Sequence, residues 1–160
     1  YLPPRLKLGR TWRLLYSSDQ DGVSLETLYH KVRIGGGITS ISDAGLVLAI
    51  RDADDHVFGA FVNESFTNNK GYYGNGDCFL WRTVQPKEGT PYIKTYPTTL
   101  RNNYNILSTH EYLSLGGGID GRYGLWIDSS FEKGVTARSE TYGNEILSDD
   151  RDRPEPVGKD

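Results

Sequence analysis

The chain has 160 residues, enough for one domain with a sizeable hydrophobic core. Its formal net charge is −3, and its 18 basic and 21 acidic residues are spread along the chain, which excludes the concentrated positive charge of a nucleic-acid-binding protein. No apolar run approaches the roughly 20 residues of a transmembrane helix, and the one cysteine, Cys78, cannot form an intrachain disulfide, so we expect an intracellular, cytoplasmic protein.

The first part of the chain contains the clearest predicted helix. Residues 12–16 are a short apolar run that forms either a first strand or an anchor on the core, and residues 17–22 read as a turn. Ser24 is a favoured N-cap residue, and the glycines at 35–37 end the helix. Its apolar residues recur at helical spacing: Leu25, Leu28, Tyr29 and Val32. We therefore expect one amphipathic helix here.

Beyond residue 45 the pattern changes to that of short strands. Residues 46–50 and 57–62 are apolar runs on either side of an acidic turn, and we expect them to form a hairpin with two buried faces. Further strands are expected at 78–84, 92–96, 104–107, 112–115 and 123–128, followed by a helical turn at 129–134 and an extended segment at 135–139. With 19 Gly and 11 Tyr, the chain is expected to be mainly β.

Two glycine-aromatic stretches organise the rest of the chain. In residues 116–128 three successive glycines let the chain reverse or pass close to another backbone, and the strand that follows has large side chains on both faces. Residues 71–81 have the same design, with glycines at 74 and 76. Both stretches therefore predict a tight turn that leads into a covered strand.

The candidate metal ligands are scattered. A structural zinc site needs several Cys or His side chains at short spacing, whereas Cys78, His30, His56 and His110 each stand alone, so we expect no metal. The acidic turn at 52–55 is either a solvated turn or a weak calcium site, since it lacks the Gly and the closing Glu of a calcium loop. No phosphate-binding glycine motif is complete, and we expect no cofactor.

Two residues are candidates for catalysis. Cys78 is either a buried, inert thiol or a reactive one, and its apolar neighbours Phe79 and Leu80 favour burial. His110 stands beside Glu111 as a general base beside a carboxylate would, but adjacent residues of a strand point to opposite faces. This favours a surface histidine.

A polar cluster at residues 138–144 is flanked by apolar residues and is expected to lie near the core. There it either hydrogen-bonds the glycine stretches or forms a functional surface. Glu140 is the carboxylate whose burial is most worth testing, because a buried carboxylate must be protonated or pair with Arg138.

Taken together, these motifs resemble the TLDc domain of the oxidation-resistance proteins, and the wording of the sequence is similar to that of fungal members. The resemblance covers residues 12–148 in family order, through residues 12–18, 21–25, 52–61, 73–80, 116–128 and 140–144. The residues of this chain that match the family motifs are Gly74, Gly76, Asp77, Gly116, Gly117, Gly118, Gly124, Trp126, Asp128, Glu140, Gly143 and Asn144.

The resemblance implies a fold and a role. The implied fold is mainly β (α+β), a two-sheet antiparallel β-sandwich with a few short peripheral helices. The TLDc domain would occupy residues 1–148, and residues 149–160 would be a polar tail or loop that lacks the final strand of the family. An unpaired sheet edge of that kind is expected to lower stability or to promote strand exchange.

The role implied by the resemblance is protection against oxidative damage, through association with the soluble sector of the vacuolar proton-pumping ATPase and an effect on its assembly. The family also allows mitochondrial or vacuole-surface pools, and it brings no established catalytic activity. The leading hypothesis is therefore a non-catalytic interaction domain. Its expected contact surface comprises Asn75, Asp77, Asp120 and Arg122.

Two alternatives remain open. The first is a direct antioxidant enzyme that consumes peroxide at Cys78, which requires an exposed thiol of low pKa. The second, weaker one is phosphoinositide recognition, for which the basic residues are dispersed in the sequence: Lys87, Lys94, Arg101, Lys133 and Arg138.

Overall fold

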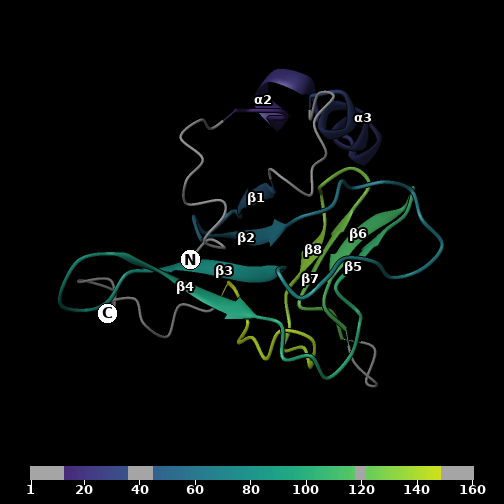
Figure 1. Ribbon diagram of the computed structural model, residues 1–160. Helices are drawn as coiled ribbons and strands as arrows, with labels where there is room; N and C mark the ends of the chain where they lie inside the picture. The colour runs from purple at the N-terminus through teal and green to yellow at the C-terminus, as the bar shows by residue number, and fades with distance from the viewer. Residues whose placement is uncertain (1–12, 36–44, 118–121, 149–160) are drawn as a thin grey trace.

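A computed structural model describes residues 13–35, 45–117 and 122–148. Within them the chain forms two four-stranded antiparallel sheets in which sequence neighbours pair (Figure 1). Sheet A contains β1 (Leu46–Arg51), β2 (Val57–Val62), β3 (Phe79–Val84) and β4 (Tyr92–Pro97). Sheet B contains β5 (Ile106–Ser108), β6 (Tyr112–Leu115), β7 (Leu125–Asp128) and β8 (Gly134–Val135). The predicted mainly β, two-sheet architecture is confirmed.

Two helices accompany the sheets in the described part of the chain. They are α2 (Ser18–Asp21) and α3 (Leu25–Gly35), and they lie together at the top of Figure 1. Neither is long and apolar enough to cross a membrane. The predicted turn at 17–22 is thus one turn of helix, ended by Gly22 at a φ of 87°.

Helix α3 forms as its sequence predicts. The Thr27 N–H donates to the Ser24 hydroxyl at 3.3 Å, which caps the first turn. Its predicted apolar face is buried in the core: Leu25, Leu28, Tyr29 and Val32. The Tyr29 hydroxyl donates to the Thr109 carbonyl at 2.9 Å, so the helix is fixed to the turn between β5 and β6.

The main core lies between the two sheets and extends under α3. Leu80 of sheet A and Leu115 and Leu125 of sheet B belong to it, and each is at most 2% exposed. Burying a side chain of this size stabilises the fold by about 1.5–3 kcal/mol. Of residues 12–16, Leu15 and Tyr16 pack on this core without forming a strand, which supports the anchor interpretation.

A second cluster lies on the other face of sheet A. Phe61 and Phe79 are opposite each other on β2 and β3, and their rings stack with centroids 5.0 Å apart. With Trp81 they form an apolar cluster separate from the main core, and all three are at most 9% exposed. The central strands of sheet A are therefore buried on both faces.

Two local predictions were wrong. Strand β1 alternates between half-buried and exposed residues, with Val47 45% exposed, so only β2 of the hairpin is buried on both faces. Residues 129–134 form a turn rather than a helical turn, because Phe131 has a φ of 59° and Gly134 already pairs with Ile127 of β7. The expectations for Gly118, Asp120 and residues 149–160 lie outside the described residues.

Candidate interaction surface

The two glycine stretches meet at one place in the structure. We call residues 71–78 and the described parts of 116–124 the glycine loops. The first is held by a pair of backbone hydrogen bonds between Tyr73 and Ile106, of 2.9 and 3.0 Å, and the Gly116 N–H donates to the Tyr104 carbonyl at 3.0 Å. Both loops therefore flank the segment that leads into β5.

Two half-exposed tyrosines cover the junction of the glycine loops. The rings of Tyr72 and Tyr104 lie 4.6 Å apart between centroids. A Cβ added to Gly117 would meet the Tyr72 hydroxyl at 3.3 Å and Tyr104 at 3.4 Å, so both side chains lie against this glycine. Because Gly117 has no side chain, Tyr72 and Tyr104 can pack directly against its backbone.

The polar segment at 139–144 supports the glycine loops from the inside. The Gly117 N–H donates to the Thr141 hydroxyl at 3.0 Å, and the Tyr142 hydroxyl donates to the Asn105 carbonyl at 2.9 Å. The Ser139 hydroxyl donates to the Asn144 side-chain oxygen at 2.6 Å. These side chains are buried, and the predicted hydrogen bonding between this segment and the glycine loops is present.

The motif glycines differ in the structural reason why a larger residue would not fit. Gly116 has a φ of 82°, and a Cβ there would lie 2.8 Å from the Ser139 hydroxyl oxygen and 2.9 Å from Tyr142. Gly124 has no positive φ, but its Cβ would meet the Leu115 carbonyl and Leu80, both at 2.9 Å. Gly116 and Gly124 are therefore structural.

The other motif residues have varied surroundings. Gly74 and Gly143 have positive φ, whereas the Cβ site of Gly76 meets only Leu100 at 3.5 Å. On β7, Trp126 and Asp128 are half-buried, and Asp128 accepts the Lys133 N–H at 3.3 Å. Glu140 is exposed, so its carboxylate does not need the buried partner for which the sequence put it forward as a residue to test.

Three of the four predicted contact residues lie within the described residues, at the surface of the glycine loops. Asn75, Asp77 and Arg122 are exposed. The Asn75 side-chain oxygen accepts the Asp77 N–H at 2.9 Å, which closes the turn between them. Since these loops rest on buried hydrogen bonds, the surface is presented by a rigid support.

Cys78 lies beneath this surface. It is 1% exposed, and its Sγ is 3.7 Å from the side-chain oxygen of buried Asn63. Burial raises the pKa of the Cys78 thiol, against a smaller lowering by hydrogen bonds from the backbone. The thiol is therefore neither accessible nor ionised at neutral pH, which weighs against a peroxide-consuming role.

A charged cluster on sheet A was not predicted from the sequence. Arg82 is 3% exposed; its Nε donates to the Tyr96 hydroxyl at 3.0 Å and its Nη2 to Glu145 at 3.1 Å. Lys94 donates to the other carboxylate oxygen at 2.8 Å, and this hydrogen bond lowers the pKa of Glu145. The signal was an arginine inside an apolar strand, since a buried guanidinium needs a carboxylate partner.

One group of three candidate metal ligands, Asp52, Asp54 and His56, occurs in the described part of the chain. Asp52 already accepts the backbone N–H groups of Asp54 and His56, both at 2.9 Å, and lies 2.8 Å from His56 Nδ1. Burial opposes ionisation of Asp52, but the hydrogen bonds from His56 and Asp54 outweigh it and lower the pKa. The cluster is thus accounted for as a hydrogen-bonded turn.

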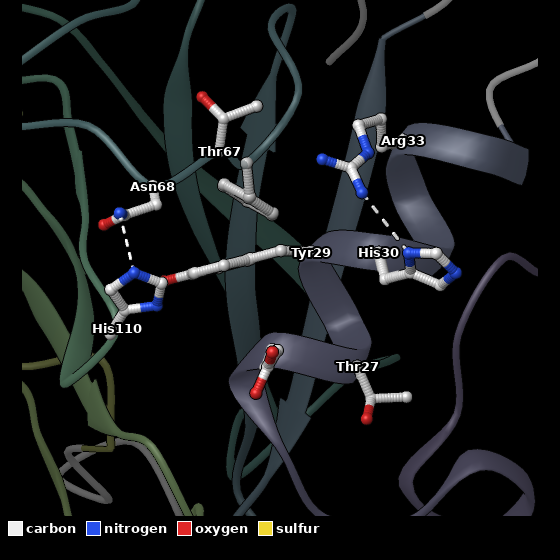
Figure 2. A pocket seen from close by; sticks show the side chains of 9 residues that line it. Thr27, Tyr29, His30, Arg33, Thr67, Asn68 and His110 are labelled. Atoms are coloured by element: carbon white, nitrogen blue, oxygen red, sulfur yellow. Dashed lines mark hydrogen bonds between the residues drawn. The ribbon is translucent and has the colours of Figure 1, made fainter.

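A pocket of about 440 Å³ lies between α3, residues 66–68 and His110. His110 and His30 lie on opposite sides of it, with Tyr29 between them (Figure 2). His110 Nε2 is 2.8 Å from the Asn68 amide nitrogen, and His30 Nδ1 is 3.3 Å from Arg33. Each of these histidines thus pairs with an amide or a guanidinium, and within the described part of the chain no hydrogen bond to a carboxylate orients either ring as a base.

His110 and Glu111 occupy the turn between β5 and β6 rather than a strand, and both are exposed, so the predicted surface histidine is confirmed. Burial raises the pKa of Tyr29, whose hydroxyl already donates to backbone carbonyls. The pocket therefore offers polar contacts rather than an acid–base pair.

A second pocket, of about 330 Å³, brings together two of the five dispersed basic residues, Arg101 and Arg138. Of the others, Lys94 binds Glu145, and Lys87 and Lys133 are exposed elsewhere on turns.

The two-sheet fold and its glycine loops, supported by the polar segment at 139–144, are those of a known domain family. Residues 1–157 match the model of the TLDc domain, and the chain belongs to the TLDc domain family. It is 42% identical over 151 residues to "Oxidation resistance protein 1" of Yarrowia lipolytica, which covers 94% of this chain. The proteins of the same name from Kluyveromyces lactis and Saccharomyces cerevisiae are 38% and 37% identical, each over 92% of this chain. The chain spans 62–64% of the length of these three relatives.

Proposed function

We propose that this TLDc domain is a non-catalytic interaction module that contributes to resistance against oxidative stress. The names of the fungal relatives support the biological role, and the burial of Cys78 supports an indirect mechanism. The observation that carries the proposal is the exposed surface of the glycine loops, held in place by the buried side chains of Thr141 and Tyr142. Rigidly supported loops are a common place for binding residues.

The proposed partner is the soluble sector of the vacuolar proton-pumping ATPase, whose assembly the domain would regulate from the cytoplasm. This partner follows from the family resemblance. A phosphoinositide role has less support, because the five basic residues considered for it do not gather on one surface.

Co-sedimentation of the domain with the purified vacuolar ATPase tests the proposal, with ATPase activity and release of the soluble sector measured in the same tube. Saturable binding that lowers activity is expected. An Asp77→Lys variant should bind at least about tenfold more weakly, because it reverses a charge on the proposed surface. Glu88→Lys makes the same change on the exposed turn between β3 and β4 and is the matched control. Absence of binding by a folded domain would refute the partner.

A further inference from the structure

The second pocket is the feature that the proposed function leaves unused. It is lined by Thr99, Arg101, Arg138, Ser139, Glu140 and Gly143. We propose that this pocket binds a carboxylate side chain of an acidic protein segment, held between the guanidinium groups of Arg101 and Arg138. The inference rests on the proposed function that the domain acts by binding a protein, and it specifies the chemistry of that partner.

The walls of the pocket are fixed by hydrogen bonds between two distant segments. The Thr99 N–H donates to the Thr141 carbonyl at 2.8 Å, and the Thr99 hydroxyl donates to the Glu140 carbonyl at 2.6 Å. The Arg101 N–H donates to the Thr99 hydroxyl oxygen at 3.3 Å. Thr99 and Glu140 are 41 residues apart in sequence, so this clamp places Arg101 and Arg138 on one pocket.

The charges in the pocket favour a single carboxylate. Arg101 and Arg138 are both exposed, and neither forms an ion pair with another described residue. Glu140 contributes one negative charge, which leaves one positive charge in excess. A guanidinium matches a carboxylate with two parallel hydrogen bonds.

A phosphorylated membrane lipid fits this pocket less well. Its headgroup carries more negative charge than the single excess positive charge would balance, and Glu140 would repel it. The formal net charge of the chain, −3, also opposes attraction to an anionic membrane surface.

An apolar residue beside the pocket extends the site. Leu100 has a φ of 63°, a conformation that non-glycine residues seldom adopt, and its side chain is 79% exposed. The same side chain lies 3.5 Å from the Cβ site of Gly76 in the first glycine loop. Strained exposed residues of this kind concentrate at binding sites. The partner segment is therefore expected to place an apolar side chain next to its acidic one.

The test uses a fluorescein-labelled peptide of alternating Glu and Leu, with a peptide of alternating Gln and Leu as its control, and fluorescence anisotropy. The domain should bind the Glu peptide and not the Gln peptide. Arg101→Gln and Arg138→Gln should each weaken binding by about tenfold or more, the value of a charge-assisted hydrogen bond. Arg51→Gln changes an exposed arginine on β1 and should have no effect.

A fourth variant should change the affinity for the Glu peptide in the opposite direction. Glu140→Gln removes the opposing charge from the pocket and should tighten binding of the Glu peptide severalfold. Equal affinity for both peptides, or unchanged affinity in both arginine variants, would overturn the inference. Binding to vesicles with anionic lipid that depends on Arg101 and Arg138, without binding of the Glu peptide, would also overturn it in favour of a lipid ligand.

The peptide assay contains no ATPase, so the two proposals can fail separately. If the domain binds the Glu peptide but not the ATPase, the second pocket is retained as a carboxylate site and the proposed ATPase partner is refuted. Binding of the ATPase that Arg101→Gln and Arg138→Gln leave unchanged would retain the partner and overturn the pocket.

Discussion

Substitution of Gly116 by alanine should destabilise the domain more than the same exchange at Gly22, Gly71 or Gly124. Its φ of 82° is unfavourable for alanine, and the new Cβ would lie 2.8 Å from the Ser139 hydroxyl oxygen and 2.9 Å from Tyr142. The backbone conformation costs about 1–2 kcal/mol, and overpacking a buried site costs about 1–3 kcal/mol. The expected loss is the sum, about 2–5 kcal/mol, which corresponds to a fall in Tm of about 4–20 °C for a domain of this size.

Three further substitutions separate the two contributions. Gly22 has a φ of 87° and a ψ of 170°, a region that is nearly confined to glycine, but nothing lies within 4 Å of its Cβ site, so Gly22→Ala should cost only the conformational part, about 1–3 kcal/mol. Gly124 has no positive φ but meets Leu115 and Leu80 at 2.9 Å, so Gly124→Ala should cost only the packing part, about 1–3 kcal/mol. Gly71 has neither feature, and Gly71→Ala should stay within about 0.5 kcal/mol of the parent.

Urea unfolding followed by circular dichroism measures all four free energies of unfolding. If Gly116→Ala is no less stable than Gly22→Ala and Gly124→Ala, the conformational and packing costs do not combine at Gly116. A loss in Gly71→Ala as large as that in Gly116→Ala would also contradict the prediction, since it would show a general effect of removing glycine.

Three further predictions concern the side chains of Cys78, Glu145 and Tyr142. The thiol of Cys78, 1% exposed, should react with a thiol reagent only as the protein unfolds, and rapid labelling in native buffer would reopen the peroxide-consuming alternative. Glu145→Gln should lower Tm at pH 7. Because its hydrogen bond with Lys94 lowers the pKa of Glu145 in the folded state, the stability it contributes is present above the unfolded pKa of about 4.3 and is lost as the pH falls through the folded pKa. The difference in Tm between parent and variant should therefore shrink below about pH 4, and a constant difference from pH 7 to pH 3 would exclude this explanation. Tyr142→Phe removes the hydroxyl that donates to the buried Asn105 carbonyl and should cost about 1–3 kcal/mol in urea unfolding; an unchanged midpoint would show that water replaces the bond.

The elements that the sequence predicts well are those specified by neighbouring residues. Helix α3 has its cap at Ser24 and its apolar residues at one spacing, and both signals lie within the helix itself. The burial of a strand depends instead on its place in the sheet. Residues 46–50 are as apolar as a central strand, yet β1 is at the edge of sheet A and Val47 is 45% exposed.

Glu140 and Glu145 show that the pairing of a carboxylate, like the burial of a strand, cannot be predicted from neighbouring residues alone. The sequence directs attention to Glu140, two residues after Arg138 in a polar cluster, but this side chain is exposed. The structurally paired carboxylate is Glu145, whose partner Arg82 is 63 residues away. A pattern of neighbouring residues cannot reveal a pair that is so far apart in the sequence. Arg82 and Glu145 meet only because the segment that contains Glu145 packs against sheet A. The glycine loops were predictable as turns, whereas the different requirements of Gly116 and Gly117 depend on Ser139 and Tyr104, which lie outside the loops.

The polar segment at 139–144 serves stability and the proposed recognition with different side chains. Thr141, Tyr142 and Asn144 are buried: Thr141 binds the Gly117 N–H of the second glycine loop, Tyr142 binds the Asn105 carbonyl, and Asn144 binds Ser139 of its own segment. Glu140, one residue from Thr141, is exposed at the second pocket. Changes to the buried set should lower the free energy of unfolding, and a change to Glu140 should alter peptide affinity with little effect on stability. Because the Glu140 and Thr141 carbonyls both accept hydrogen bonds from Thr99, the pocket and the glycine loops share one backbone support. Loss of the Thr99 hydroxyl, in Thr99→Val, should therefore weaken binding at the pocket without any charge being removed.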